Sequence, residues 1–188
     1  MKQNIEWIKT QIDVSSKVFK QMVNICSEEI LASSEIITES LDRGNKIFWC
    51  GNGGSAGQSQ HLSAELVCGL RSHKRSALAS ISLTTDTSVL TCIANDFGYD
   101  KIFERQLEGL GKKGDILIAM STSGKSKNII NLLKMAKKLN IKSICLLGYN
   151  GGICKKLSDY NYIVPSNSTA NIQEVHHLIG HIFCSLVD

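Results

Sequence analysis

The chain has 188 residues, of which 43% are hydrophobic and 20% charged, and its formal net charge is +4. This is the composition of an ordinary α/β protein of one domain, with enough chain to bury a sizeable core. Lys and Arg are scattered instead of forming a basic stripe, which argues against nucleic acid as the main partner. No apolar run is long enough to span a bilayer, and residues 1–6 lack the apolar core of a signal peptide, so we expect no membrane association.

Apolar residues at helical spacing open the chain. Ile5, Ile8 and Ile12 share one helix face, and the pattern continues to Leu41. This predicts one or two long helices that end near Gly44. This N-terminal helical segment is longer than is needed to cover one face of a small sheet, so we expect part of it to pack against another subunit.

Strands alternate with helices through the rest of the chain. We predict strands at 46–50, 77–83, 115–120, 143–147 and 162–164, and helices at 55–70, 84–93, 102–110, 129–139 and 171–186, with a turn at 95–98. Alternation of this kind implies right-handed crossovers and a mostly parallel five-stranded sheet between two helical layers. Ligands of such sheets bind beyond the carboxyl ends of the strands.

Seven cysteines are spread along the chain. The number is odd, no pair has the CxxC spacing of a zinc site, and most lie in apolar segments, as Cys50, Cys92, Cys145 and Cys184 do. We therefore expect reduced thiols in the core of a cytoplasmic protein.

A glycine-rich turn, Gly51-Asn-Gly-Gly-Ser55, follows the first predicted strand and opens a helix. Glycines allow a ligand to approach the backbone, and free N–H groups at a helix N-terminus hold an anion. The turn also matches G-x-G-x-x-A, the dinucleotide fingerprint. That fingerprint expects an acidic residue about 20 positions later. Because Asp86 lies further along, dinucleotide binding is disfavoured.

A second turn, residues 121–126, follows the third predicted strand and contains four hydroxyl groups. A phosphomonoester needs many donors around its oxygens, and this turn supplies them with little charge. It is not a Walker loop, because the position five before Gly124 is Ala119. The turn predicts phosphate binding, although a serine-rich turn that only caps a helix has a similar sequence.

His61 and Glu65 are four residues apart in the predicted helix 55–70, so they lie on the same face. They are candidate metal ligands or an acid–base pair. A solvent-exposed His and Glu without a function is the commoner arrangement for such a pair taken alone.

The last predicted helix strengthens the metal hypothesis. Gln173, His177 and His181 repeat every four residues, with Glu174 and His176 beside them. Two imidazoles and two oxygens, one set from each helix, suit zinc or a similar divalent ion. The spacing does not decide which of the three histidines takes part, and we expect one or two of them to be structural.

Together these motifs give the chain a specific resemblance over nearly its whole length. It resembles the sugar isomerase (SIS) domain family, and within it the phosphoheptose isomerases, at 51–56, at His61 and Glu65, at 95–98, at 121–126 and from Ile172 to His181. The resemblance implies the SIS fold, an α/β/α sandwich with a long N-terminal helical extension. It also implies a single domain over 1–188, in which 1–44 serve packing and oligomerisation and 45–188 form the α/β core.

The resemblance further implies an enzyme that converts sedoheptulose 7-phosphate into D-glycero-D-manno-heptose 7-phosphate for bacterial surface polysaccharide, as a homotetramer with sites at subunit interfaces. It implies one zinc ion per subunit, on His61, Glu65, Gln173 and His181. It implies substrate contacts from Asn52, Gly53, Gly54, Ser55, Glu65, Asn95, Asp96, Ser121, Thr122, Ser123, Ser126 and Gln173.

The residue types fit this chemistry. A ketose becomes an aldose when a proton moves between neighbouring carbons through an enediol. We hypothesise that Glu65 is the catalytic base and His181 the catalytic acid, each contributing roughly 10²–10⁴-fold. A divalent ion acts as Lewis acid on the sugar oxygens.

Three positions depart from the family pattern, and two other readings remain. Gln58 stands where Asp is frequent, 66–71 contains one residue more than the usual Leu-x-Gly-Arg, and Asn171 replaces a common Arg. These changes concern the shape of the sugar pocket.

The alternatives are a non-catalytic SIS protein that binds the replication initiator protein and one that senses a sugar phosphate. Retention of Glu65 and His181 favours the enzyme.

Overall fold

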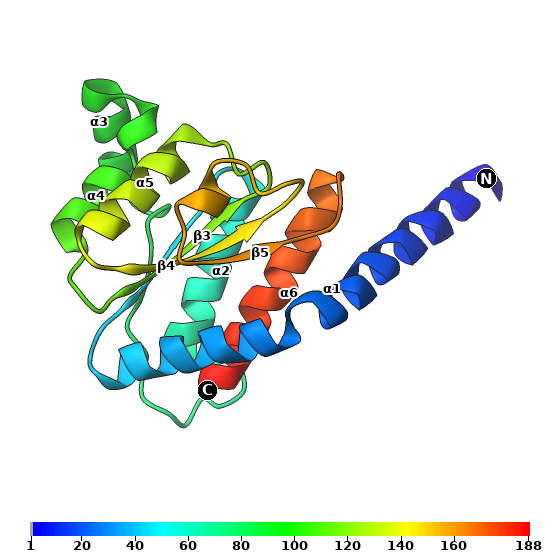
Figure 1. The fold of residues 1–188 in the computed structure, drawn as a ribbon, viewed down its shortest axis with the longest axis horizontal. Helices are drawn as coiled ribbons and strands as arrows, with labels where there is room; N and C mark the ends of the chain where they lie inside the picture. Colours follow the sequence, from blue (N-terminus) through cyan, green and yellow to red (C-terminus); the bar gives the residue numbers. More distant parts are fainter. Residues whose placement is uncertain (1) are drawn as a thin grey trace.

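A five-stranded parallel sheet forms the centre of the computed structural model, which describes residues 2–188 (Figure 1). The strand order is β2-β1-β3-β4-β5, and each neighbouring pair is parallel. The strands are β1 (Ile47–Cys50), β2 (Ser80–Ser82), β3 (Ile116–Ser121), β4 (Lys142–Leu147) and β5 (Tyr160–Ile163). All five predicted strands are therefore present, although β2 is shorter than the predicted 77–83.

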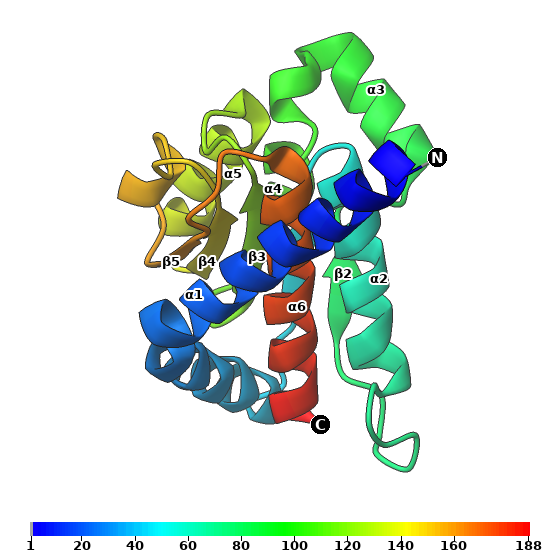
Figure 2. The same ribbon diagram turned by 90° about the vertical axis from the view of Figure 1, so that its right-hand side faces the viewer.

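Helices cover both faces of the sheet. They are α1 (Lys2–Asp42), α2 (Gly54–Cys68), α3 (Thr87–Phe97), α4 (Glu104–Leu110), α5 (Lys127–Lys138) and α6 (Thr169–Val187), with short 3₁₀ turns η1 (Tyr99–Lys101) and η2 (Cys154–Lys156). Helices α1, α2 and α6 lie on one face, and α4 and α5 on the other (Figure 2). The predicted three-layer sandwich is confirmed.

Successive strand residues face opposite layers and so build two cores. In β1, Ile47 and Trp49 join the core beneath α1, α2 and α6, whereas Phe48 and Cys50 join the core beneath α4 and α5. All four side chains are fully buried. Strands buried on both faces read as continuous apolar runs, which is why periodicity could identify them from the sequence.

Helix α1 is a single helix of 41 residues, in agreement with the predicted helical prefix. Its buried residues begin at Val18, and its C-terminal part packs on α6. The N-terminal part projects away from the sheet (Figure 1). There Trp7 and Ile12 are 64% and 62% exposed.

Two local predictions that concern α3 are wrong. Residues 95–97, predicted as part of a turn, are helical, because α3 ends only where Gly98 adopts a φ of +92°. Cys92, predicted as a core thiol, is exposed, because α3 buries none of its residues. The start of α3 is as predicted, with the Asp86 carboxylate accepting a hydrogen bond from the Val89 amide at 2.9 Å.

Cys68 also departs from the prediction of core thiols, and the other five cysteines agree with it. All seven are free thiols, and all except Cys68 and Cys92 are buried. Within residues 2–188 no helix has both the length and the apolar character that crossing a bilayer requires.

Candidate functional site

The glycine turn connects the end of β1 to the start of α2. Gly51 is buried, and a β-carbon there would lie 2.6 Å from the Ser55 side chain, so only glycine allows this tight return. Gly53 caps the helix with a φ of +56°. The sequence therefore places a backbone turn at the carboxyl end of the central strands, as predicted.

Asn52 joins this turn to the hydroxyl-rich turn. Its amide exchanges two hydrogen bonds with the Asn128 amide, of 3.0 and 2.8 Å, and Tyr99 donates to its oxygen at 3.0 Å. Asn128 lies in the first turn of α5, directly after the second loop. Sequence reasoning missed Asn128 and Tyr99, although Asn128 lies two residues after the second turn and Tyr99 directly follows residues 95–98.

The second turn, residues 121–126, also lies at the carboxyl edge of the sheet. The Ser121 and Ser126 hydroxyls are 3.3 Å apart, and Ser121 Oγ accepts the Gly124 amide at 3.1 Å. Gly124 has a φ of +61° and packs directly on the Gly151 carbonyl. A pocket of about 480 Å³ opens beside the turn and is lined by Ser123, Lys125, Tyr149, Asn150 and Asn167.

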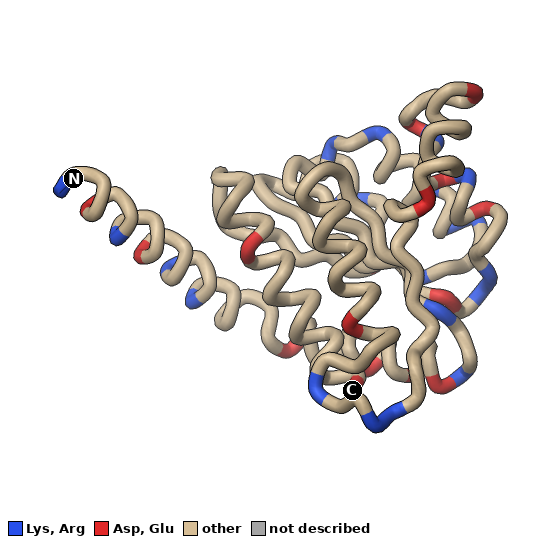
Figure 3. Tube along the Cα trace, turned by 180° about the vertical axis from the view of Figure 1, so that it is seen from behind, with Lys and Arg blue, Asp and Glu red and all other residues tan. Residues whose placement is uncertain are grey.

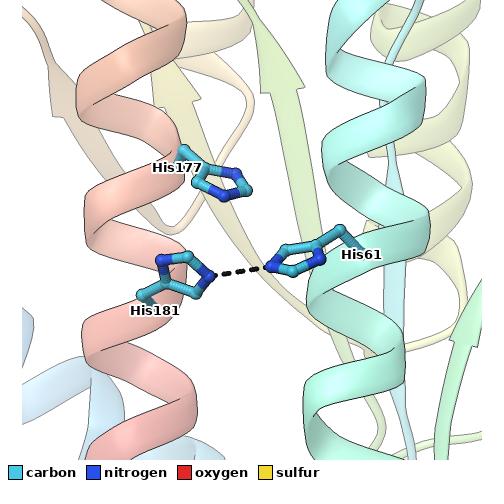
Figure 4. A group of neighbouring side chains, drawn as sticks. All are labelled: His61, His177 and His181. Atoms are coloured by element: carbon cyan, nitrogen blue, oxygen red, sulfur yellow. Dashed lines mark hydrogen bonds between the residues drawn. The ribbon is translucent and has the colours of Figure 1, made fainter. Parts of the chain in front are cut away.

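Three histidines meet between α2 and α6, with His61 from α2 and His177 and His181 from α6 (Figure 4). The Nε2 atoms of His61 and His181 are 2.8 Å apart. The His177 ring stacks on His61 with a centroid separation of 4.9 Å and lies edge-on to His181 at 4.3 Å. One ring nitrogen from each of the three histidines lies within 4.8 Å of the corresponding nitrogens of the other two.

Glu65 completes this cluster from the next turn of α2. Its Oε1 lies 3.3 Å from Nε2 of His61, as the four-residue spacing predicts. Burial lowers the pKa of His177, the neighbouring His181 and His61 lower it further, and Glu65 opposes the shift. A neutral imidazole is the form that binds a metal.

Gln173 lies near the N-terminal end of α6, on the helix face that carries His177 and His181 and next to the glycine turn. Its side-chain amide covers Gly54, where a β-carbon would lie 2.8 Å from Nε2 and 3.0 Å from Oε1. The Gln58 side chain donates to the Gln173 carbonyl at 2.8 Å. Gln58, one of the departures from the family pattern, thus ties α2 to α6.

His176 is the structural histidine of the set. Its side chain is fully buried, and its Nε2 lies 3.0 Å from the Leu147 carbonyl. Burial lowers the pKa of His176 to about 4. The expectation that one or two of the three α6 histidines are structural therefore holds for His176.

Asn95 and Asp96 do not meet the histidines within this chain. Both are exposed near the end of α3. Among residues 2–188 their side chains bond only locally, Asn95 to Asp96 at 2.8 Å and Cys92 to Asp96 at 3.5 Å. A smaller pocket of about 230 Å³, lined in part by Asn52, separates α3 from the glycine turn.

Comparison with known proteins identifies the family of the chain. The family model of the SIS domain matches residues 12–148. The chain belongs to the SIS-domain family. The phosphoheptose isomerase of Akkermansia muciniphila is 44% identical to it over 97% of this chain and 96% of that protein.

Two solved SIS-domain structures match nearly the whole chain. The phosphoheptose isomerase of Francisella tularensis superposes with a TM-score of 0.95, at 32% identity over 98% of both chains. That of Neisseria gonorrhoeae gives a TM-score of 0.92, at 36% identity over 97% of both chains. Within the SIS-domain family the chain therefore belongs with the phosphoheptose isomerases.

Proposed function

We propose that this protein is an aldose–ketose isomerase that converts sedoheptulose 7-phosphate into D-glycero-D-manno-heptose 7-phosphate. The observation that supports it most is the cluster of His61, Glu65 and His181 between α2 and α6. Both helices cover the same face of the sheet, and α2 begins at the glycine turn. The reaction needs a base, an acid and a means to polarise sugar oxygens, and this cluster supplies the residue types for all three.

Glu65 is our candidate for the catalytic base and His181 for the catalytic acid. In this scheme Glu65 removes the proton from the carbon beside the carbonyl, and His181 delivers a proton to the developing oxyanion. Glu65 then returns its proton to the former carbonyl carbon, and His181 takes the proton from the neighbouring hydroxyl group, which gives the aldose. Each proton transfer contributes roughly 10²–10⁴-fold.

The residues present fit a divalent cation. Imidazole nitrogens within 4.8 Å of one another, with the Glu65 carboxylate 3.3 Å from His61, form a donor set typical of zinc. We assign His61, Glu65 and His181 to its binding, with Gln173 as the fourth donor that the family resemblance implies. A bound zinc ion supplies Lewis-acid polarisation of the sugar oxygens.

The two turns are the proposed substrate cradle. Hydroxyl and amide donors of the second turn hold the phosphate, and the first turn with its neighbours holds the sugar. The proposed phosphate ligands are Ser121, Thr122, Ser123 and Ser126, and the proposed sugar ligands are Asn52, Gly53, Gly54, Ser55, Glu65, Asn95, Asp96 and Gln173.

We further propose that the enzyme is a cytoplasmic homotetramer that supplies heptose for bacterial surface polysaccharide. Free, mostly buried thiols support a reducing compartment. The exposed apolar face of α1 supports assembly, and the position of Asn95 and Asp96 on α3, apart from the histidines, supports sites shared between subunits. In this scheme 1–44 serve assembly and 45–188 form the catalytic core of one SIS domain.

Incubation of the purified protein with sedoheptulose 7-phosphate in D₂O, with and without zinc, tests the proposal. We expect NMR to show aldose formation and deuterium at the reacting carbon. Glu65→Gln and His181→Asn should lose turnover, whereas His73→Asn, in an exposed loop, should keep it. Absence of conversion by folded, zinc-loaded protein would contradict the proposal, and near-normal turnover in either site variant would remove that residue from its role.

A further inference from the structure

A network of hydrogen bonds joins Asn52 of the glycine turn to Asn128 of α5 and Tyr99 of η1. Nδ2 of Asn52 donates to Oδ1 of Asn128 at 3.0 Å, and Nδ2 of Asn128 donates back to Oδ1 of Asn52 at 2.8 Å. The Tyr99 hydroxyl donates to the same Asn52 oxygen at 3.0 Å. Asn128 is only 3% exposed, so its half of the amide pair is shielded from water. Side chains from two separate elements thus determine how one amide lies.

The backbone of α5 fixes which way round the two amides are. The Ile129 amide donates to Oδ1 of Asn128 at 2.9 Å, and because a backbone N–H can only donate, the Asn128 atom beside it is the oxygen. Nδ2 of Asn128 is then the atom that faces Asn52, and it requires the Asn52 oxygen as its acceptor. That oxygen has two lone pairs, which Asn128 and Tyr99 both use. The Asn52 amide therefore has donor capacity left for a ligand but no acceptor capacity.

The network also connects the three segments to which the proposed function assigns substrate contacts. Asn52 belongs to the glycine turn, and Asn128 follows the second turn by two residues. Tyr99 directly follows Gly98, where α3 ends. Asn52 and Tyr99 both line the pocket of about 230 Å³ between α3 and the glycine turn. An oxygen-rich ligand in the cradle formed by these segments therefore meets the Asn52 amide.

We propose that Asn128 and Tyr99 are positioning residues that hold Asn52 as a hydrogen-bond donor to a substrate oxygen. This inference rests on the proposed function and adds to it two residues that act through Asn52. An amide held in this orientation selects an acceptor oxygen at this place in the cradle. Without its partners the amide turns freely, and the lost preorganisation weakens substrate binding.

The contact is remote from the proposed acid and base. Glu65 and His181 lie on α2 and α6, which cover one face of the sheet, whereas α5 covers the other. The bonds to Asn128 turn the Asn52 side chain toward α5. A contact away from the reacting carbons is made alike in the bound substrate and in the transition state. Its loss should therefore raise KM and leave kcat within about 2-fold.

Calorimetric titration with the reduced substrate, the alditol of sedoheptulose 7-phosphate, measures binding without turnover. This probe keeps the phosphate and hydroxyl groups but has no carbonyl group to isomerise. Tyr99→Phe removes one hydroxyl group and should weaken binding about 3- to 10-fold, as expected for one hydrogen bond. In the Asn52→Ala background the same change should alter the affinity less than about 2-fold, because its bonding partner is gone. Tyr160→Phe, at the amino end of β5, is the matched control and should bind like the unmodified protein.

Asn128→Asp tests the orientation of the amide pair. The aspartate keeps an acceptor for the Ile129 amide and for Nδ2 of Asn52, but it replaces the donor to Asn52 by a second acceptor. Asn52 then has to turn its amide, so binding of the alditol should weaken about 10-fold or more. This loss should largely disappear in the Asn52→Ala background, and a loss that persists there would overturn the role of Asn128. Asn161→Asp places the same charge in β5 and is the matched control.

The two backgrounds separate positioning from direct contact. Equal losses from Tyr99→Phe in both would show that its hydroxyl binds the ligand itself, and full affinity of the variant would show that it has no role; either result overturns the inference. A fall in kcat at unchanged KM does the same. An unmodified protein that does not bind the alditol contradicts both the inference and the proposed function. Binding with the expected coupling, in a protein that fails to isomerise sedoheptulose 7-phosphate, leaves the inference standing and removes only the proposed reaction.

Discussion

Gly180 of α6 lies directly against Leu62 of α2. A β-carbon at Gly180 would lie 2.8 Å from Leu62 Cδ2 and closer still to Cδ1. Leu62 follows His61 in the sequence and Gly180 precedes His181. The two helices are therefore in close contact at the level of the histidine cluster, where the two Nε2 atoms are 2.8 Å apart. We infer that the missing side chain of Gly180 allows this separation.

Gly180→Ala should separate the two helices and weaken metal binding. Overpacking of a dense core costs about 1–3 kcal/mol, so the free energy of unfolding should fall by that amount in urea titrations. Zinc affinity should fall in the same variant, because His61 and His181 move apart. Gly57→Ala is the matched control, since it lies in α2 with open space around the added methyl group.

The double variant Leu62→Ala with Gly180→Ala tests whether the contact between Gly180 and Leu62 sets the spacing of the two helices. Leu62→Ala alone removes a fully buried side chain and should cost about 2–5 kcal/mol. In the double variant the added methyl group enters the space that Leu62 vacates, so the cost should be less than the sum of the single costs. Additive costs would show that the contact between Gly180 and Leu62 does not set the helix spacing.

Gly54→Ala should reduce turnover with little effect on stability. The added β-carbon meets only the flexible Gln173 amide, which can move away, and alanine is the better helix former. Displacement of Gln173 from the substrate cradle should lower kcat/KM, measured with sedoheptulose 7-phosphate. Gly57→Ala, in the same helix, should keep full activity. Unchanged kcat/KM in a folded Gly54→Ala variant would exclude Gln173 from substrate contact.

Asp188 should stabilise the fold only above its own titration range. Its carboxylate accepts hydrogen bonds from the Arg71 and Ser72 amides and from Arg75, whose guanidinium also donates to the Glu65 carbonyl at 3.3 Å. Burial acts to raise the pKa of Asp188, but these hydrogen bonds and the Arg75 charge outweigh it and hold the pKa below its ordinary value of 3.8.

The sign follows from the lowered pKa. The stabilising contribution is complete above pH 3.8 and disappears as the pH falls through the lower, folded-state value. The difference in unfolding free energy between the unmodified protein and Asp188→Asn should therefore be constant from about pH 5 to 8 and shrink below about pH 4. A difference that grows as the pH falls would contradict this assignment.

The exposed face of α1 should hold the proposed tetramer together. Figure 3 shows acidic and basic residues interspersed along the projecting part of the helix, so we expect association there to depend on its exposed apolar side chains. Trp7→Glu and Ile12→Glu should shift sedimentation toward monomers without loss of helix, since both side chains are more than 60% exposed in this chain. Gln11→Glu, an exposed polar neighbour, should leave assembly intact, and monomers in the unmodified protein would exclude the tetramer.

Local patterns in the sequence determined the order and type of nearly every element. Buried parallel strands such as Ile47–Cys50 appear as continuous apolar runs, and the long amphipathic period predicts α1. The two turns were predictable because glycine and serine at strand ends have direct conformational consequences. The pairing of His61 with Glu65 follows from helix geometry alone.

Only the tertiary structure decided which residues of distant elements meet. Asn52 pairs with Asn128, Gly180 admits Leu62, and His177 joins His61 across more than 100 residues of chain. The rotation of α6 about its axis places Gln173 at the glycine turn and His177 in the cluster, a choice that four-residue spacing leaves open. Helical periodicity specifies a face, whereas the packing of two helices specifies which residue of that face meets which partner.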